Sequence, residues 1–120
     1  MVLPAALPKQ TRVKDLGTMP WLLNGAGTRC ASATLEILEA NEVRPRIAAT
    51  VADNATLLAL VAAGHGVTIA PSLLLQNLPH GVILSTEDFE IERTLFAVAR
   101  RASGAPVAAL VDAIRRSSTA

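Results

Sequence analysis

Apolar and polar positions follow their clearest pattern between residues 46 and 71. An apolar run at residues 46–51 predicts a strand. Asp53 and Asn54 come directly after it, and their short side chains can accept hydrogen bonds from the free amides of a helix's first turn. A helix is therefore predicted to begin at this point.

The predicted helix has one apolar stripe and a defined end. Leu57, Leu58 and Val61 recur at i, i+1 and i+4, and Gly64 follows the last apolar turn, where a left-handed residue costs least. Beyond Gly64, the apolar run at residues 67–70 predicts a short strand that is buried on both faces. Together these segments predict a strand, a helix and a second strand parallel to the first.

Hydrophobic spacing divides the rest of the chain into shorter elements. It predicts strands at residues 21–23, 82–84 and 93–100, a short helix at residues 72–78, and longer helices from residue 28 or 29 and from residue 106. The apolar stripe of the first long helix is Ala31, Leu35 and Leu38, and that of the last is Val107, Leu110, Val111 and Ile114. Strands that alternate with helices predict an α/β fold, in which a mostly parallel sheet is flanked by helices and ligands bind at the carboxyl ends of strands.

Composition narrows the class of protein. With 120 residues, of which 51% are hydrophobic and 18% charged, the chain suits one soluble globular domain with a substantial core. Only 2% of the residues are aromatic, so we expect no ring-rich surface on which bases could stack. The formal net charge is +1 and basic residues are scattered among acidic ones, so this chain alone is expected to bind DNA poorly.

The sequence gives no sign of a membrane-spanning segment, a disulfide bond or a metal site. No apolar run approaches the roughly 20 residues that cross a bilayer, and the amino-terminal segment is too short and proline-interrupted for a signal peptide, which favours a cytoplasmic protein. The single cysteine excludes an internal disulfide and a cysteine zinc site, and nothing near the histidines has metal-ligand spacing. We therefore expect no metal and no cofactor.

The loop after the predicted strand at residues 21–23 is the first candidate binding site. Asn24, Gly25, Gly27 and Thr28 join the carboxyl end of that strand to the start of a helix. The glycines allow a close approach to the backbone, and exposed amides at a helix N-terminus attract anions. Thr28 could add a hydroxyl, so a carboxylate is the natural ligand. The alternative is a plain turn with a helix cap.

The second strand-to-helix junction is a weaker candidate. Asn54 and Ala55 follow Asp53 at the carboxyl end of the strand at residues 46–51, where a ligand could contact them. Helix capping alone explains Asp53 or Asn54, however.

Cys30 is the one residue that suggests catalysis. It falls in the first turn of a helix, where the helix dipole lowers the pKa of a thiol. Only His65 and His80 could serve as its base, and no second cysteine could resolve an oxidised one. A buried and inert Cys30 is the expected outcome, and no enzyme activity is predicted.

Several short segments occur along the chain in a characteristic order. They are Lys14-Asp15-Leu16, Pro20-Trp21-Leu22-Leu23, Arg44-Pro45-Arg46, the leucine-rich run at residues 57–64, Ile69-Ala70-Pro71, and the run at residues 93–101 with the helix from Pro106. In this order and spacing the chain resembles the effector-binding domain of LysR-type transcriptional regulators over about residues 12–117.

The resemblance implies a periplasmic-binding-protein-like (type II) fold, with two α/β lobes and a ligand cleft between them. Residues 1–92 would form the second lobe, which would be incomplete, and residues 93–120 the C-terminal strand and helix that return to the first lobe. Both candidate junctions would face the cleft and bind a small, anionic effector. DNA would be bound only through an N-terminal domain that this chain lacks.

Other readings of the sequence remain open. A lobe of a transporter's solute-binding protein would have the same fold, and a small cytosolic thiol enzyme would use Cys30. Self-association is also expected, because Leu95, Phe96, Val98 and the stripe of the last helix would lack the cover of the first lobe. The resemblance implies a homodimer as well.

Overall fold

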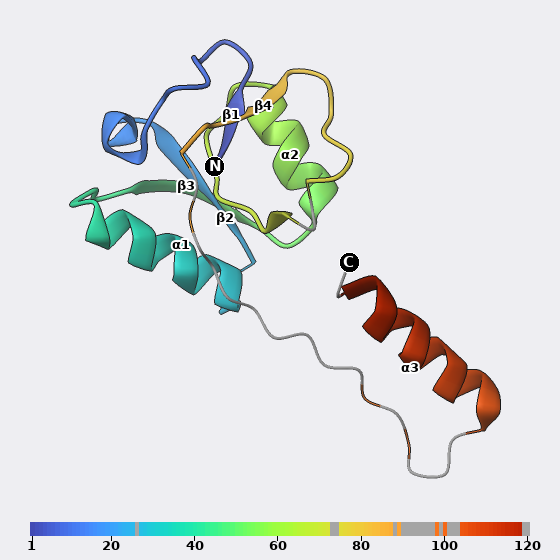
Figure 1. The fold of residues 1–120 in the computed structure, drawn as a ribbon. Helices are drawn as coiled ribbons and strands as arrows, with labels where there is room; N and C mark the ends of the chain where they lie inside the picture. The colour runs from blue at the N-terminus through green and yellow to red at the C-terminus, as the bar shows by residue number, and fades with distance from the viewer. Residues whose placement is uncertain are drawn as a thin grey trace.

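The computed structural model describes residues 1–25, 27–72, 75–87, 89, 98, 100 and 104–118 (Figure 1). Its elements in chain order are β1 (Val2–Pro4), the 3-10 helix η1 (Val13–Leu16), β2 (Pro20–Asn24), α1 (Arg29–Ala40), β3 (Arg46–Val51), α2 (Asn54–Ala62), β4 (Val82–Leu84) and α3 (Ala105–Ser118). The strands predicted at residues 21–23, 46–51 and 82–84 and the helices predicted to begin near residues 28, 54 and 106 are therefore confirmed.

The four strands form two two-stranded sheets, which one short bridging segment connects. β1 pairs with β4 in antiparallel fashion, and β2 pairs with β3 in parallel. Val67 and Thr68 connect the two pairs, because Thr68 bridges Val2 in antiparallel fashion and Val67 bridges Trp21 in parallel. The order across the sheet is thus β4, β1, residues 67–68, β2, β3. Only β1 runs against the others. The prediction of an α/β fold is confirmed, whereas parallel pairing is limited to β2 with β3 and to the bridge between Val67 and Trp21.

Side chains of the central strands alternate between two apolar cores. Leu3 of β1 and Trp21 of β2 join one core, to which Leu38 of α1 belongs, while their neighbours Val2 and Leu22 join the other. Successive residues of a strand point to opposite faces of its sheet, which accounts for this division. The second core contains Leu57, Leu58 and Val61 of α2. The two helices therefore cover opposite faces, as expected for an α/β sheet (Figure 1).

The predicted apolar stripe of α1 is wrong at Leu35. This side chain is 43% exposed, whereas Ala31, Thr34 and Leu38 are buried. The buried face of the helix follows i, i+3 and i+7, and Leu35 lies on its outer margin. Ile47 of β3 is also exposed, since β3 is the edge strand of the sheet. The margin formed by α1 and β3 therefore carries apolar side chains in contact with solvent.

Two further predicted elements differ in the structure. The helix expected at residues 72–78 is absent from residues 75–78, where the Leu75 amide closes a turn by donating to the Ser72 carbonyl at 3.0 Å. Prolines on both sides leave too short a segment to offset the cost of starting a helix. The strand expected at residues 67–70 is reduced to the bridges at Val67 and Thr68, although residues 67–69 are buried as predicted.

An acidic side chain in the connection after β4 is structural. Glu87 Oε2 accepts a 2.6 Å hydrogen bond from the amide of Val13, at the start of η1, and its side chain is largely buried. The Ser85 hydroxyl donates to the Thr11 carbonyl at 2.8 Å. These contacts join the segment before η1 to the segment after β4.

The last helix stands apart from the sheet (Figure 1). Val107, Leu110 and Ile114 of α3 are exposed, with Leu110 at 61%, and Val98 is 93% exposed. The predicted strand at residues 93–100 lies outside the described residues, apart from Val98 and Arg100, which are in no strand. The radius of gyration is 16.8 Å, against about 13.6 Å for a compact chain of this length.

Within the described part of the chain, no helix is both long enough and apolar enough to cross a membrane.

Candidate functional site

Two strand-to-helix junctions lie side by side at one edge of the sheet. Asn24, the last residue of β2, is paired with Val51, the last residue of β3, and the Gly25 amide donates to the Val51 carbonyl at 2.9 Å. The side chains also meet, since Asn24 Nδ2 donates to Asn54 Oδ1 at 2.8 Å. The structure thus brings together the two candidate loops, which are far apart in the sequence.

The first junction needs its glycines. Gly25 and Gly27 have φ angles of 67° and 72°, which side chains other than hydrogen rarely allow. A Cβ on Gly25 would lie only 2.8 Å from Cγ2 of Thr28, whereas a Cβ on Gly27 would meet nothing within 4 Å. Gly25 is therefore required by the fold of the loop, and Gly27 borders open space in which a ligand could approach the backbone.

Thr28 is the N-cap of α1, and its hydroxyl is already engaged. Its oxygen accepts from the Ala31 amide at 3.2 Å, and it lies 2.7 Å from the Asn24 carbonyl and 2.8 Å from the Gly25 carbonyl as a donor. The hydroxyl that the sequence offered to a ligand thus holds the loop instead. The cap of α1 is a neutral hydroxyl, and the first turn of the helix carries no acidic residue. The positive end of the helix dipole is therefore available to an anion.

The second junction is capped by a charged group. Asp53 Oδ2 accepts hydrogen bonds from the Thr56 amide at 2.9 Å and from the Thr56 hydroxyl at 2.6 Å. The side-chain and backbone bonds from Thr56, with a smaller contribution from the Ala55 amide, lower the pKa of Asp53. The start of α2 therefore already binds a carboxylate of its own. A second anion at Ala55 would be repelled by it, whereas the neutral amide of Asn54 can still donate to a ligand.

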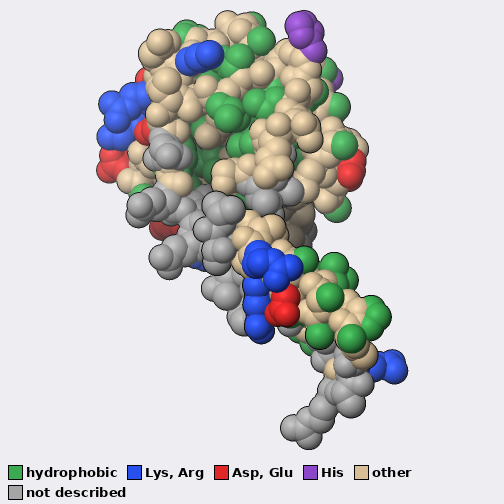
Figure 2. Space-filling model, turned by 45° about the vertical axis from the view of Figure 1, so that its right-hand side comes forward, with side chains coloured by type: hydrophobic (Ala, Val, Ile, Leu, Met, Phe, Trp, Pro, Cys, Tyr) green, Lys and Arg blue, Asp and Glu red, His purple; other side chains and the backbone are tan. Residues whose placement is uncertain are grey.

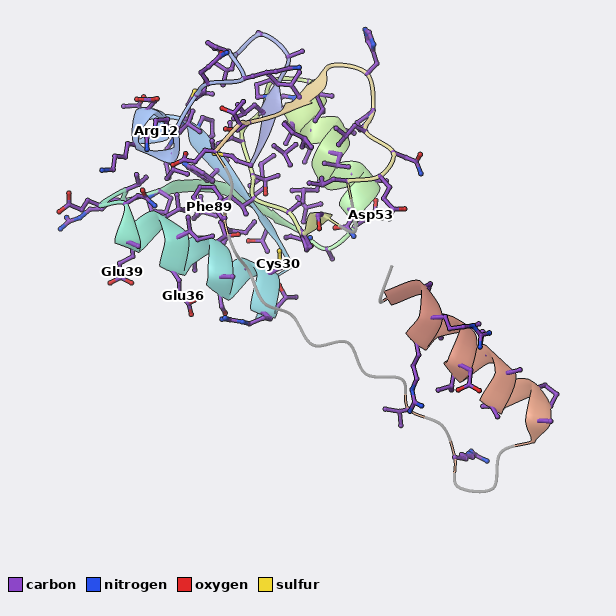
Figure 3. All side chains as sticks on the ribbon, in the orientation of Figure 1. Arg12, Cys30, Glu36, Glu39, Asp53 and Phe89 are labelled. Carbon is purple, nitrogen blue, oxygen red and sulfur yellow. The ribbon has the colours of Figure 1, made fainter. Side chains whose placement is uncertain are left out.

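Cys30 lies at the same edge of the sheet as Asp53 (Figure 3). Its sulfur is 3.9 Å from the carbonyl of Ile69, just beyond the bridging segment, and the residue is partly exposed rather than buried as predicted. His65 follows α2 and so lies at the other end of that helix from Asp53. Among the described residues, no three His, Cys, Asp or Glu side chains form a group that could hold a metal ion. His65, one of the two bases that the sequence offered to Cys30, is therefore at the end of α2 away from this edge.

Two hollows of the surface lie elsewhere. One, of about 440 Å³, is lined by residues between 7 and 19, and the other, of about 640 Å³, by Leu35, Glu39, Glu42, Val43, Arg44 and Pro45. The edge that carries Asn24 and Asn54 is thus a different surface from both of them.

Sequence reasoning missed two features of this edge. The first is the bond between Asn24 and Asn54, for which the only signal was that each residue ends a strand or begins the following helix. The second is the difference between the caps, a neutral Thr28 on α1 and an ionised Asp53 on α2. The sequence contained the signal for this difference, because Thr28 and Asp53 were both identified near the starts of predicted helices.

Comparison with protein families identifies the chain. The family model described as the LysR substrate binding domain matches residues 1–119, and comparison with curated proteins gave no match. Domains of this family have a type II periplasmic-binding-protein-like α/β fold, and their role is regulatory rather than catalytic. They sense a small-molecule effector for transcription regulators that are typically oligomeric. Because the family model matches almost the whole length of the chain, the chain belongs to the family of LysR substrate-binding domains.

Proposed function

We propose that this chain senses a small anionic metabolite, a carboxylate, and thereby controls transcription in the cytoplasm as the regulatory part of a LysR-type regulator. The observation that carries the proposal is the unequal capping of the two adjacent helices. α1 is capped by a neutral hydroxyl and has no acid in its first turn, whereas α2 already holds the carboxylate of Asp53. The anion is therefore expected at α1.

Each residue of the edge has a distinct part in this proposal. Gly27 leaves room for the ligand to approach the backbone, and Thr28 fixes the first turn of α1 so that its amides stay in place. Asn24 donates one hydrogen bond to Asn54 Oδ1, which leaves the amino group of Asn54 outside that bond. The side-chain amino group of Asn54 can then donate a hydrogen bond to the polar part of the effector, and it adds no charge to the site.

The regulatory step follows from differential affinity. Residues 1–92 supply one lobe of a cleft, and the effector favours the lobe arrangement in which it also contacts the other lobe. That preference is transmitted to DNA-binding domains through the oligomer. No bond is made or broken in this mechanism, so Cys30 is not required.

A pair of glycine substitutions tests where the anion binds. Gly27→Ala and Gly64→Ala both place a Cβ in open space at a positive φ angle, 72° and 82°, so each should destabilise the fold by about 1–2 kcal/mol. Only Gly27 borders the start of α1, so only Gly27→Ala should weaken binding, by roughly tenfold. Isothermal titration with benzoate and acetate measures the affinity, with benzamide and acetamide as neutral controls. Equal losses in both variants, or equal binding of acids and amides, would contradict the assignment.

A further inference from the structure

Asn24 is followed by the residue that most exposes a side-chain amide to attack by the backbone. The chain has four asparagines, and only Asn24 precedes a glycine, since the others precede Glu42, Ala55 and Leu78. The backbone nitrogen of the following residue can attack the side-chain carbonyl carbon of an asparagine, and a side chain on that residue hinders the approach. Gly25 has no side chain, so its nitrogen is the least hindered of these.

The reaction at this pair is a deamidation, with water as its only other reactant. The Gly25 nitrogen forms a bond to Cγ of Asn24, and the bond between Cγ and Nδ2 breaks. The proton lost by the Gly25 nitrogen leaves with the amino group as ammonia, and the backbone is left with a cyclic imide. Water then adds to either carbonyl group of the imide and opens it, so the product is aspartate or isoaspartate. No group is oxidised or reduced.

The structure holds both reacting groups of this pair away from one another. The Gly25 amide donates to the Val51 carbonyl at 2.9 Å, and Asn24 Nδ2 donates to Asn54 Oδ1 at 2.8 Å. The first bond directs the amide toward β3, and the second directs the side chain of Asn24 across the edge toward α2. Gly25 is buried and Asn24 is half-buried, which also limits the access of water. The folded edge therefore opposes the reaction until it opens.

The loop requires the residue that makes Asn24 reactive. Gly25 has a φ angle of 67°, and a Cβ at this position would lie 2.8 Å from Cγ2 of Thr28. The fold therefore keeps a glycine after Asn24 and suppresses the reaction by hydrogen bonding instead. We propose that Asn24 is a modification site, at which deamidation is restrained by the pairing of β2 with β3 and converts the edge to a form that carries an added carboxylate.

The added carboxylate changes the charge of the candidate effector site, a consequence that rests on the proposed function. Asn54 can rotate its side-chain amide and donate to the new group, so the aspartate product retains the contact across the edge. Figure 2 shows the acidic side chains of the described residues spread apart over the face in view, rather than gathered in one patch. One more negative charge, close to that of Asp53, is therefore a substantial local change, and it repels an anion at the start of α1.

Peptide mapping by mass spectrometry tests the reaction itself. The chain is incubated in mildly alkaline buffer with and without urea, and the loss of each side-chain amide is followed with time. In urea Asn24 should react roughly tenfold faster than the other asparagines, because nothing hinders the Gly25 nitrogen. Without urea its rate should fall by roughly tenfold or more, because the reaction then requires a local opening of the edge. Equal rates for all asparagines in urea, or equal rates for Asn24 with and without urea, would overturn the proposal.

A substitution at Asn54 tests the restraint. Asn54→Ala removes the acceptor of the Asn24 side chain and keeps a good helix former at the start of α2, so deamidation of Asn24 in the folded chain should be roughly two- to fivefold faster. Asn77→Ala is the control, since Asn77 is exposed and lies in no helix or strand. Asn41, whose side chain donates to the Ile37 carbonyl at 2.8 Å, reports any general loosening of the fold, and its rate should not change. An unchanged rate for Asn24, or an equal rise for Asn41, would overturn the restraint.

Isothermal titration with benzoate tests the consequence for binding. Asn24→Asp reproduces the aspartate product, and Asn77→Asp adds the same charge at an exposed position away from the edge. Asn24→Asp should weaken binding by roughly two- to fivefold at low salt and by less at high salt, whereas Asn77→Asp should not. Equal affinities in the two variants would overturn this consequence. Mass mapping needs no ligand, so it separates a failure of the modification from a failure of the proposed function.

Discussion

The negative charge of Asp53 should affect how strongly the candidate site binds an anion. Its carboxylate is fixed by Thr56 and lies beside Asn54, one of the proposed effector contacts. Asn is almost as good an N-cap as Asp, so Asp53→Asn should retain α2 while removing a negative charge. We expect the affinity for benzoate to rise by roughly two- to fivefold at low salt, with a smaller gain at high salt. Isothermal titration of the variant measures this, and an unchanged or weaker affinity would place the anion elsewhere.

The same substitution should change how stability depends on pH. Hydrogen bonds from Thr56 lower the pKa of Asp53 in the folded state, so its contribution to stability is present above the unfolded value of about 3.9 and is lost as the pH falls through the lower folded value. The stability difference between the unmodified chain and Asp53→Asn should therefore shrink on acidification below pH of about 4. Urea unfolding across this range measures it, and a difference that is constant with pH would contradict the account.

The sequence predicted the roles of some residues of the site but not the contacts of others. Capping by Asp53 and the turn at Gly25 and Gly27 follow from local rules, because they depend only on neighbouring residues. The bond between Asn24 and Asn54 depends on the register of β2 against β3, which no local rule gives.

At the scale of elements, the contact of the bridging segment with β2 holds the two halves of the sheet together. A Cβ on Gly66 would lie 2.7 Å from the Pro20 carbonyl oxygen and 3.0 Å from Leu22 Cγ, both in β2. Gly66→Ala should force these strands apart and destabilise the fold by about 1–3 kcal/mol. Gly17→Ala is the control, since its φ is −61° and nothing lies within 4 Å, so it should be neutral or add up to about 1 kcal/mol.

Urea unfolding of both glycine variants provides the comparison. A similar stability for Gly66→Ala and Gly17→Ala would show that the bridging segment does not pack tightly on β2.

The sequence predicted a helix or strand correctly where burial of one face sets the spacing of its apolar residues. Where other effects decide the structure, the prediction was wrong. Periodicity gave α1 and α2 almost to the residue, yet it placed Leu35 in the core, because it cannot distinguish the centre of an apolar face from its margin. A helix was expected at residues 72–78, but the prolines at positions 71 and 79 leave only a short segment. Ser72 has 3-10 conformation, and residues 75–78 are in no helix.

For the molecule as a whole, the sequence indicated the class of fold but not the arrangement of its parts. The parallel pairing of β2 with β3 brings their carboxyl ends together and makes the candidate site. The exposure of Val107, Leu110 and Ile114 of α3 was expected from the lack of a covering lobe, but the groove beside the C-terminal end of α1 was not expected.

The central claim is that a carboxylate binds at the start of α1, between the ends of β2 and β3. Backbone and side-chain amide shifts, recorded by nuclear magnetic resonance during titration with benzoate and with benzamide, test it most directly. We predict benzoate-specific shifts in Gly27, Thr28 and the first turn of α1, together with the side-chain amide of Asn54. Shifts confined to the surface around residues 7–19, or silence at the start of α1 while other residues respond, would contradict the account.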